Sequence, residues 1–483
     1  MDQSTLKNKV ASGMVWKFAD VFTTKIITFI VSVVIARILL PSDYGVVAMA
    51  SIFITIADVF VSNGLNTSLI QKKNADHLDF SSIFYCCMAM SLILYALIFF
   101  AAPYIADFYN QDLLTIILRV MGLKLPLQSF NSIQQAKVSR DLQFKKYFWS
   151  SLGGTLASGV AGVAAAYAGL GVWALIIQQF TDVIMDSTIM LFTIRWFPRL
   201  EFSKERAKPL VSYGSKVVAA NLIGTIFNQL SSFIIGKKYT SSDLAYYNKG
   251  QNIPQIISNQ LQTTVSGVLF PAMAKVSDDI DAVKKICSRS IQIMSFLMFP
   301  IMTGLIITSK YIIRLLLTEK WMMAVPYMQI MCLSGMIETL ESIAGVQALK
   351  ATGRSDVALR IEFIKKPIYL AVLFIAVPFG VEAIAIAAPV CSAIAVLINL
   401  KAASRYTNYS IKDALVDISI PLLLSVIMGL AVYLENFLAV GDLLKLIIMC
   451  VSGFGIYLIL AKVCHVKIYD YVLDILKNML HKN

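Results

Sequence analysis

The chain has 483 residues, of which 58% are hydrophobic and only 15% are charged, and its mean hydropathy is +0.72. Soluble globular proteins carry about 25% charged residues, so the composition excludes an ordinary soluble protein. The formal net charge of +13 would elsewhere suggest nucleic-acid binding. Here the basic residues lie in short loops between apolar segments, and we expect no nucleic acid partner.

Apolar segments recur along the whole chain. A helix needs about 20 apolar residues to cross a bilayer, whereas a membrane β-barrel would show short alternating segments. The sequence therefore predicts an all-α polytopic membrane protein with about 14 transmembrane helices. The predicted spans are residues 14–37, 43–65, 81–106, 112–136, 147–168, 171–194, 209–235, 243–270, 286–308, 322–349, 359–379, 383–404, 414–434 and 442–462.

The basic residues are unevenly divided between the loops. Every second loop is rich in Lys and Arg, from Lys72–Lys73 to Lys401–Lys412, whereas residues 107–112 and 435–442 on the opposite side contain neither. Cytoplasmic loops carry the excess of Lys and Arg in membrane proteins. We therefore expect both termini to be cytoplasmic.

One stretch of sequence occurs twice. ARILLPSDYGVVAMA (residues 36–50) and GKKYTSSDLAYYNKG (residues 236–250) align at an offset of 200, which places Ser42–Asp43 on Ser242–Asp243. Each Ser-Asp pair stands between two apolar segments, where its side-chain oxygens can accept hydrogen bonds from the first N–H groups of the next helix. The pattern indicates one helix–turn–helix unit in each half of the chain.

The repeat divides the chain into lobes. We predict an N-terminal lobe of six spans in residues 1–200 and a C-terminal lobe of six spans in residues 201–410. Residues 411–483 add two apolar spans, expected to face lipid, and a cytoplasmic tail. Two lobes of the same orientation form a known transporter plan, in which the substrate site lies between them.

Basic and amide side chains interrupt the spans. An ionisable residue at membrane depth costs about 2.5–3.5 kcal/mol on insertion scales, so these residues indicate a water-filled cavity, expected along spans one, two, seven and eight. Lysines would suit the phosphates of a ligand, and amides would suit a sugar. The alternative is structural: internal pairing, such as Lys17 with Asp20, or snorkelling to the interface. The candidate substrate-binding residues are Lys17, Lys25, Arg119, Lys124, Lys216, Asn228, Lys249, Asn252, Gln255 and Asn259.

Acidic residues also lie within the spans. They are candidates for coupling transport to protons or sodium ions, namely Asp20, Asp58, Asp182, Asp186, Glu338 and Glu341. The three histidines are far apart and none of the seven cysteines forms a CxxC pair, so we expect no metal site, no disulfide and no cofactor. Nucleotide-binding and hydrolase motifs are absent from the sequence, which argues against an enzyme.

Span five repeats small residues at every fourth position. Ser150, Gly154, Ser158, Gly162 and Ala166 therefore share one face of the predicted helix. Small residues at this spacing allow two helices to approach closely. We interpret the stripe as packing within the N-terminal lobe.

Several segments together resemble a known family. ARILLPSDYGVVAMA, SLIQKK, DLAYYNKGQ, VLFPAMAKVSDD and EKWMMAVPYMQ (residues 319–329) are similar to the polysaccharide transporter family of lipid-linked oligosaccharide flippases. This family belongs to the multidrug/oligosaccharidyl-lipid/polysaccharide exporter superfamily, and the likeness is strongest to Wzx-type members that serve colanic and teichuronic acid export. The resemblance covers nearly the whole chain.

The resemblance implies a fold and an activity. The fold would be two six-helix lobes in a V, plus two further helices. The activity would be translocation of undecaprenyl-pyrophosphate-linked oligosaccharide across the bacterial inner membrane by alternating access of a cationic central cavity, for capsule, exopolysaccharide or O-antigen export. Membrane lipids, and a polysaccharide polymerase with its export machinery, would be the partners.

Residues of the cavity can also be compared with the family. Related lipid II flippases carry cationic residues on spans one, two and eight, and Lys17, Lys25 and Lys249 occupy comparable places here. Span two departs from that pattern, because its charged residue is Asp58.

Two other functions stay open. A MATE-like cation or drug antiporter would share the twelve-span repeat but would favour acidic and aromatic cavity residues. A membrane glycan polymerase or ligase would need a long outer loop, and every predicted outer loop is short.

Overall fold

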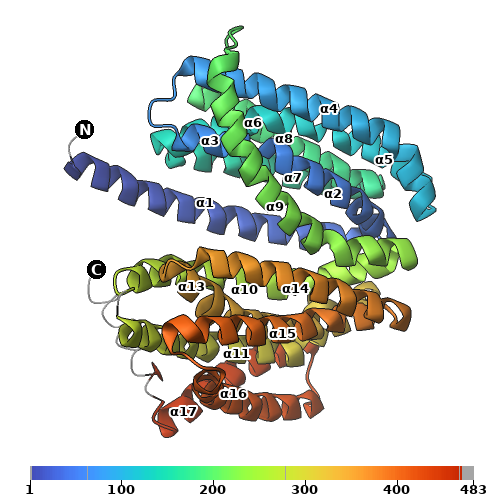
Figure 1. The fold of residues 1–483 in the computed structure, drawn as a ribbon. Coiled ribbons are helices and arrows are strands. Elements are labelled where there is room, and N and C mark those ends of the chain that lie inside the picture. The colour runs from blue at the N-terminus through green and yellow to red at the C-terminus, as the bar shows by residue number, and fades with distance from the viewer. Residues whose placement is uncertain (1–2, 63, 278, 467, 470–483) are drawn as a thin grey trace. The chain divides into compact units, whose positions relative to one another are not determined.

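The computed structural model describes residues 3–62, 64–277, 279–466 and 468–469, and the regular elements in these ranges are all helices (Figure 1). Ten helical stretches of the described chain are long and apolar enough to cross a membrane, which confirms the polytopic all-α prediction. The main helices are α1 (Gln3–Ile38), α2 (Pro41–Ser62), α3 (Leu65–Gln71), α4 (His77–Tyr109), α5 (Leu113–Gly122), α6 (Lys124–Asp141), α7 (Phe144–Tyr167), α8 (Val172–Ile194), α9 (Lys204–Lys238), α10 (Ser241–Ala274), α11 (Ile280–Leu317), α12 (Val325–Leu340), α13 (Ala348–Ala351), α14 (Ser355–Ala376), α15 (Val381–Thr407), α16 (Ile411–Leu434) and α17 (Asp442–Val463).

Each predicted span coincides with helical structure, and the described residues show breaks within spans four and ten. Span four is divided at Leu123 into α5 and α6. Span ten begins in a 3-10 helix (Glu319–Ala324) and continues through α12, a π-helical turn at Glu341–Gln347 and the short α13. A π-helical turn widens the helix by one residue and is frequent at functional sites.

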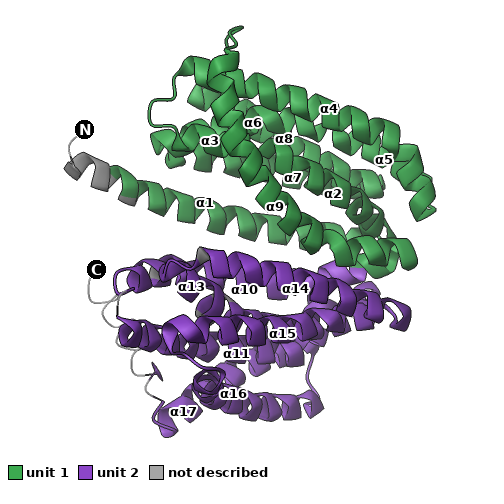
Figure 2. Cartoon of the chain, viewed as in Figure 1, with its two compact units in different colours: residues 1–245 green, residues 246–483 purple. Residues whose placement is uncertain are grey.

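The helices group into two compact units, residues 1–245 (unit 1) and 246–483 (unit 2) (Figure 2). Within unit 1, α9 packs against α2, α3 and α4. The predicted lobe boundaries at residues 200 and 410 concern the sequence repeat rather than packing, and they stay a prediction.

The repeated turns are capped in a way that differs from the prediction. The Asp43 carboxylate accepts from the N–H of Leu40 at 3.1 Å, and the Asp243 carboxylate accepts from the N–H of Thr240 at 3.1 Å. Both carboxylates therefore reach back to the residue before the helix. In the second turn Thr240 completes the capping box, because its hydroxyl accepts from the N–H of Asp243 at 3.1 Å. Leu40 has no side-chain oxygen, so the first turn keeps only half of the box.

The small-residue stripe of α7 packs against α8, as predicted. A Cβ atom added at Gly154 would lie 3.2 Å from the carbonyl oxygen of Asp182, and one at Gly162 would lie 2.8 Å from Cβ of Gln178. The Ser150 hydroxyl donates to the carbonyl oxygen of Asp186 at 2.8 Å. This close contact fixes the face of α8 that carries its two aspartates.

Unit 2 is built around α11, against which α12, α16 and α17 pack. Tyr457 of α17 donates to the carbonyl oxygen of Phe296 at 2.9 Å, and Tyr311 donates to Asn436 at 2.7 Å. The last two helices are therefore held on α11 by hydrogen bonds, while their other faces expose large apolar side chains such as Val451. That these two helices face lipid stays a prediction.

Candidate functional site

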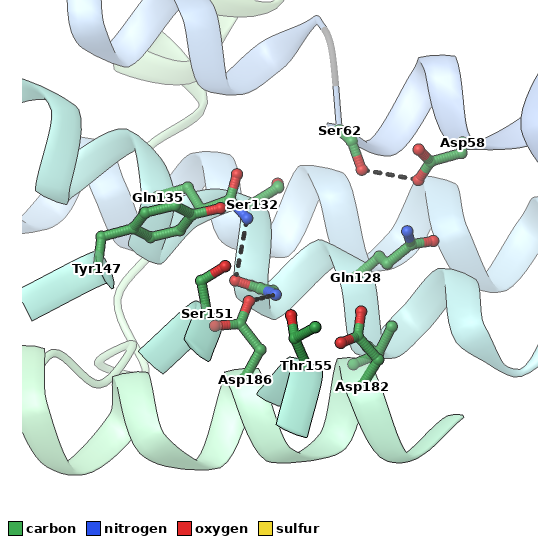
Figure 3. A pocket seen from close by; sticks show the side chains of 12 residues that line it. Asp58, Ser62, Gln128, Ser132, Gln135, Tyr147, Ser151, Thr155, Asp182 and Asp186 are labelled. Carbon is green, nitrogen blue, oxygen red and sulfur yellow. Dashed lines mark hydrogen bonds between the residues drawn. The ribbon is translucent and has the colours of Figure 1, made fainter. Parts of the chain in front are cut away.

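A polar hollow of about 300 Å³ lies within unit 1 (Figure 3). Helices α2, α6, α7 and α8 each contribute side chains at spacings of three or four, so each helix presents one polar face to it. The lining residues are Asp58, Ser62, Gln128, Asn131, Ser132, Gln135, Tyr147, Ser151, Thr155, Asp182, Val183 and Asp186.

Asp186 is the best-bound carboxylate of the hollow. Its Oδ1 accepts from the Ser150 hydroxyl at 2.6 Å, and its Oδ2 accepts from the Asn131 amide at 2.7 Å. These bonds join α6, α7 and α8 at one point. Hydrogen bonds to a charged acceptor are roughly twice as strong as neutral ones, so Asp186 is placed to hold this wall of the hollow together.

The other two carboxylates are less completely bound. Asp58 accepts from the Ser62 hydroxyl at 2.7 Å through Oδ1, and Asp182 accepts from the Ser158 hydroxyl at 3.3 Å through Oδ1. Among the described residues, no hydrogen bond reaches the Oδ2 atom of either aspartate. Both therefore keep an acceptor for a ligand.

Three of the predicted cationic residues are bound within unit 1. Lys17 pairs with the buried Asp20 at 3.0 Å and lies 4.6 Å from the ring centroid of Tyr147. Arg119 Nε donates to the carbonyl oxygen of Phe99 at 3.3 Å, and Lys124 donates to the Gln179 amide oxygen at 2.9 Å. The contact between Lys17 and Asp20 supports the alternative that these two residues pair with each other for structural reasons.

The remaining candidates are spread over both units. Lys249 is buried, with its Nζ 5.7 Å from the ring centroid of Trp321. Glu341 pairs with Lys365 at 2.7 Å, and Glu338 lies one turn before it. The exposed candidates on α1, α9 and α10 are Lys25, Lys216, Asn228, Asn252, Gln255 and Asn259. The transport roles of all these residues stay predictions.

The hollow brings together only part of the predicted set. Asp58, Asp182 and Asp186 line it, whereas no Lys or Arg does so among the described residues. Sequence reasoning missed Tyr147 and Ser151, which stand beside the small-residue stripe of α7. Their spacing of four, together with Thr155, was the available signal.

A second hollow, of about 550 Å³, lies at the start of α11 in unit 2 and has the opposite charge. Lys284 pairs with Asp413 at 3.2 Å, and Gln292 donates to Asp417 at 2.5 Å. Its lining residues are Asp281, Lys284, Lys285, Ser288, Arg289, Gln292 and Ile468.

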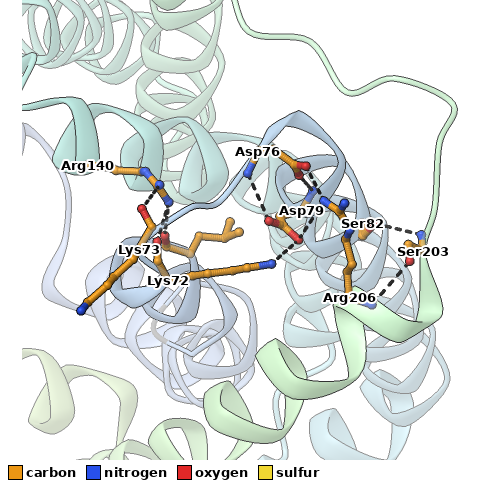
Figure 4. Close-up of polar contacts among 9 residues, drawn as sticks. Lys72, Lys73, Asp76, Asp79, Ser82, Arg140, Ser203 and Arg206 are labelled. Carbon is orange, nitrogen blue, oxygen red and sulfur yellow. Dashed lines mark hydrogen bonds and ion pairs between the residues drawn. The ribbon is translucent and has the colours of Figure 1, made fainter.

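Unit 1 also has a cluster of ionic contacts around the turn between α3 and α4 (Figure 4). Arg140 donates to the carbonyl oxygens of Leu69, Lys72 and Lys73 at 3.1, 2.8 and 2.8 Å. Lys72 pairs with the buried Asp79 at 2.7 Å. These bonds satisfy carbonyl groups that the end of α3 leaves unpaired, so Arg140 fixes the turn to α6.

The same turn is tied to α9. Asp76 and Asp79 form a capping box at the start of α4, and Arg206 of α9 binds the Asp76 carboxylate. The hydrogen bond from Arg206 lowers the pKa of Asp76 to about 2. The Ser203 N–H donates to the Ser82 hydroxyl at 3.0 Å. The turn therefore connects α3, α4, α6 and α9 on one side of unit 1.

The helical units and their polar interior define a multi-pass membrane transporter. The family described as "Polysaccharide biosynthesis protein" matches residues 34–326, which is more than half of the chain. The chain belongs to this family, and the predicted resemblance to Wzx-type polysaccharide transporters is confirmed.

The named relatives share little sequence identity with this chain, but they align with most of its length. The lipopolysaccharide biosynthesis protein WzxC of Escherichia coli is 22% identical over 77% of this chain and 76% of its own length. The succinoglycan biosynthesis transport protein ExoT of Rhizobium meliloti is 24% identical over 67% of this chain and 66% of its own length. The teichuronic acid biosynthesis protein TuaB of Bacillus subtilis is 21% identical over 73% and 74%.

Two solved structures share the fold. The lipid II flippase MurJ, in an inward closed conformation, superposes with a TM-score of 0.74 at 15% identity, over 94% of this chain and 99% of that chain. An inward-facing MATE family multidrug transporter superposes with a TM-score of 0.64 at 10% identity, over 79% and 94%. The chain therefore shares the fold of these two transporters.

Proposed function

We propose that the protein is a flippase that moves undecaprenyl-pyrophosphate-linked oligosaccharide repeat units across the bacterial inner membrane for polysaccharide export. The observation that carries this proposal is the family match, together with relatives named for lipopolysaccharide, succinoglycan and teichuronic acid biosynthesis. Both termini would be cytoplasmic, as the basic loops predict. A polysaccharide polymerase and export machinery would act on the translocated product.

The physical task is to carry a polar head group through an apolar layer. The polyprenyl tail can stay in lipid, so only the head group needs a polar route. Each uncompensated charge at membrane depth costs several kcal/mol. Alternating access of a central cavity with cationic residues would lower this cost for the pyrophosphate, and polar side chains would do so for the sugars.

Acidic residues supply the candidates for ion coupling. Asp58, Asp182 and Asp186 share one hollow, which supports a proton or sodium site there more than at Glu341, whose carboxylate is paired with Lys365. Transport that persists at full rate after both ion gradients are collapsed would remove this part of the proposal.

A second candidate function is a cation or drug antiporter. The acidic character of the unit 1 hollow favours it, because carboxylates attract organic cations. The family match argues for the flippase instead, since the named relatives serve polysaccharide synthesis.

The deciding experiment is a leaflet assay in proteoliposomes with an undecaprenyl-pyrophosphate oligosaccharide that carries a fluorescent sugar. Lys249→Ala and Lys25→Ala are compared with wild type, and Lys238→Ala, at the exposed end of α9, is the matched control. Flipping by wild type and the control, with weaker flipping by the two variants, is expected. Efflux of an organic cation without any flipping would assign the protein to the antiporters.

A further inference from the structure

The hollow of unit 1 contains acceptors that no protein donor uses. The Oδ2 atoms of Asp58 and Asp182 receive no hydrogen bond from the described residues. Oε1 of Gln128 is buried and also has no partner there. Leaving the buried Gln128 oxygen unpaired costs about 1–3 kcal/mol. Asp182 is exposed and Asp58 is half-buried, so their Oδ2 atoms can bind water. All three acceptors can take a hydrogen bond from a ligand that donates.

The hollow also contains donors, on α7. Tyr147, Ser151 and Thr155 stand four residues apart on α7 and line the hollow. None of their hydroxyl groups makes a hydrogen bond to another described residue. A hydroxyl can donate one hydrogen bond and accept others. The hollow thus presents acceptors on α2, α6 and α8 and donors on α7.

The charge of the hollow decides which head-group component fits it. Its lining includes three carboxylates and, among the described residues, no Lys, Arg or His. Lys17 is paired with Asp20. Lys124 donates to the Gln179 amide and interacts electrostatically with Asp58 and Asp182, but it does not line the hollow. Three carboxylates outnumber this one cation, and like charges repel strongly where water is scarce, so the hollow disfavours a pyrophosphate or a uronate relative to a neutral sugar.

The volume of the hollow and the arrangement of its side chains further limit the chemical class of the ligand. The volume of about 300 Å³ is at the lower end of small-molecule sites, about 300–1,000 Å³, and suits a single sugar residue or a disaccharide. Within the described part of the chain, no group of three or more His, Cys, Asp or Glu side chains is arranged to hold a metal ion. A sugar, whose hydroxyls both donate and accept, matches both the acceptors and the donors of the hollow.

We propose that the hollow of unit 1 binds an uncharged sugar residue of the transported oligosaccharide. Asp58 and Asp182 accept hydrogen bonds from sugar hydroxyls, while the hydroxyls of Ser151 and Thr155 donate to sugar oxygens. This inference rests on the proposed flippase function and adds a preference for neutral over acidic sugars at this position.

The test uses full-length protein in proteoliposomes and two probes. One is undecaprenyl pyrophosphate with a neutral glucose disaccharide, and the other carries a disaccharide that ends in glucuronate. Wild type is expected to flip the neutral probe at least about tenfold faster, the range of one hydrogen bond to a charged group. Asp58→Asn and Asp182→Asn are expected to reduce this ratio below threefold. Asp112→Asn, outside the hollow, is the matched control and keeps the wild-type ratio.

Two results would overturn the sugar site. One is equal flipping of both probes by wild type. The other is an unchanged ratio in both Asn variants, and loss of gradient dependence in those variants would then assign the hollow to ion coupling. If wild type flips neither probe, the flippase proposal itself fails.

A second measurement does not depend on transport. The rate of thiol labelling at Ser151→Cys, after subtraction of the wild-type rate, is expected to fall at least fivefold in the presence of the neutral probe. The glucuronate probe is expected to leave the rate unchanged. Equal protection by both probes, or by neither, contradicts the assignment.

Discussion

One hollow in unit 1 and one in unit 2 differ in charge and in the groups that bind their charged side chains. The unit 1 hollow has three aspartates, bound by neutral donors such as Ser62, Asn131 and Ser150. The unit 2 hollow has three basic residues, of which Lys284 is paired with a carboxylate. Neutral donors stabilise a carboxylate without cancelling its charge. Among the described residues, the aspartates of the acidic hollow are therefore compensated only by cations outside its lining, such as Lys124, whereas a lysine that lines the basic hollow is directly paired with a carboxylate.

The charged residues of the two hollows also have different origins. The basic hollow lies at the first turns of α11, in the stretch where the sequence predicts a cytoplasmic loop. Its lysines follow the general bias of cytoplasmic loops. The acidic residues lie within α2 and α8, which are long apolar helices, and topology gives no reason for them. The unit 1 hollow is therefore the stronger candidate for a function-specific site.

The largest expected effect is on Asp186, which connects three helices. Asp186→Ala leaves the Asn131 amide and the Ser150 side chain without their carboxylate, and we expect a loss of about 2–4 kcal/mol in unfolding free energy. Thermal melting in detergent measures it. Asp112→Asn should melt like wild type, and an Asp186→Ala protein as stable as wild type would show that the three-helix junction contributes nothing.

The next effect concerns the packing that forms the hollow. Gly162→Val places new carbon atoms against Cβ of Gln178, already 2.8 Å from an added Cβ, and should cost about 1–3 kcal/mol through overpacking. Gly224→Val is the matched control, because nothing lies within 4 Å of its Cβ position. Melting curves of the pair are the measurement. Equal losses in the two variants would rule out close α7–α8 packing as the cause.

A smaller effect is expected in the basic hollow. Lys284→Gln removes a pair with Asp413 that is about one-third exposed on each side, and exposed pairs contribute about 0–1 kcal/mol. The preference of the Lys284→Gln variant for the neutral probe over the glucuronate probe should match that of wild type. A changed preference would mean that the two hollows do not divide the charge recognition as proposed.

Much of the fold follows from the sequence, because about 20 apolar residues in a row leave a helix as the natural solution in a membrane. The break at Leu123 and the π-helical turn at Glu341–Gln347 do not alter hydropathy, so no window reveals them. The small-residue stripe through Gly154 could be predicted from the sequence, because it repeats at every fourth position within one helix. The hollow could not be predicted, since Tyr147 and Asp182 belong to different helices and only the packing of those helices brings both side chains to the same hollow.

The smallest effect concerns Asp76, a carboxylate of unit 1 that does have a cationic partner. Arg206 lowers the pKa of Asp76 to about 2, below the unfolded value of about 3.9. Because the folded pKa is the lower one, the stabilisation is complete above about pH 4 and is lost as the pH falls towards 2.

The Asp76 carboxylate is half exposed, so water screens this pair and its contribution to the free energy of unfolding should be small. Melting temperatures of wild type and Arg206→Gln are compared between pH 6 and pH 3. The difference between the two proteins should shrink as the pH falls, because protonation removes what the substitution has already removed. A difference that is constant with pH would show that Arg206 stabilises unit 1 by packing rather than by charge. Asp76 would then differ from the aspartates of the hollow only in its position, and not in having a cationic partner that stabilises the fold.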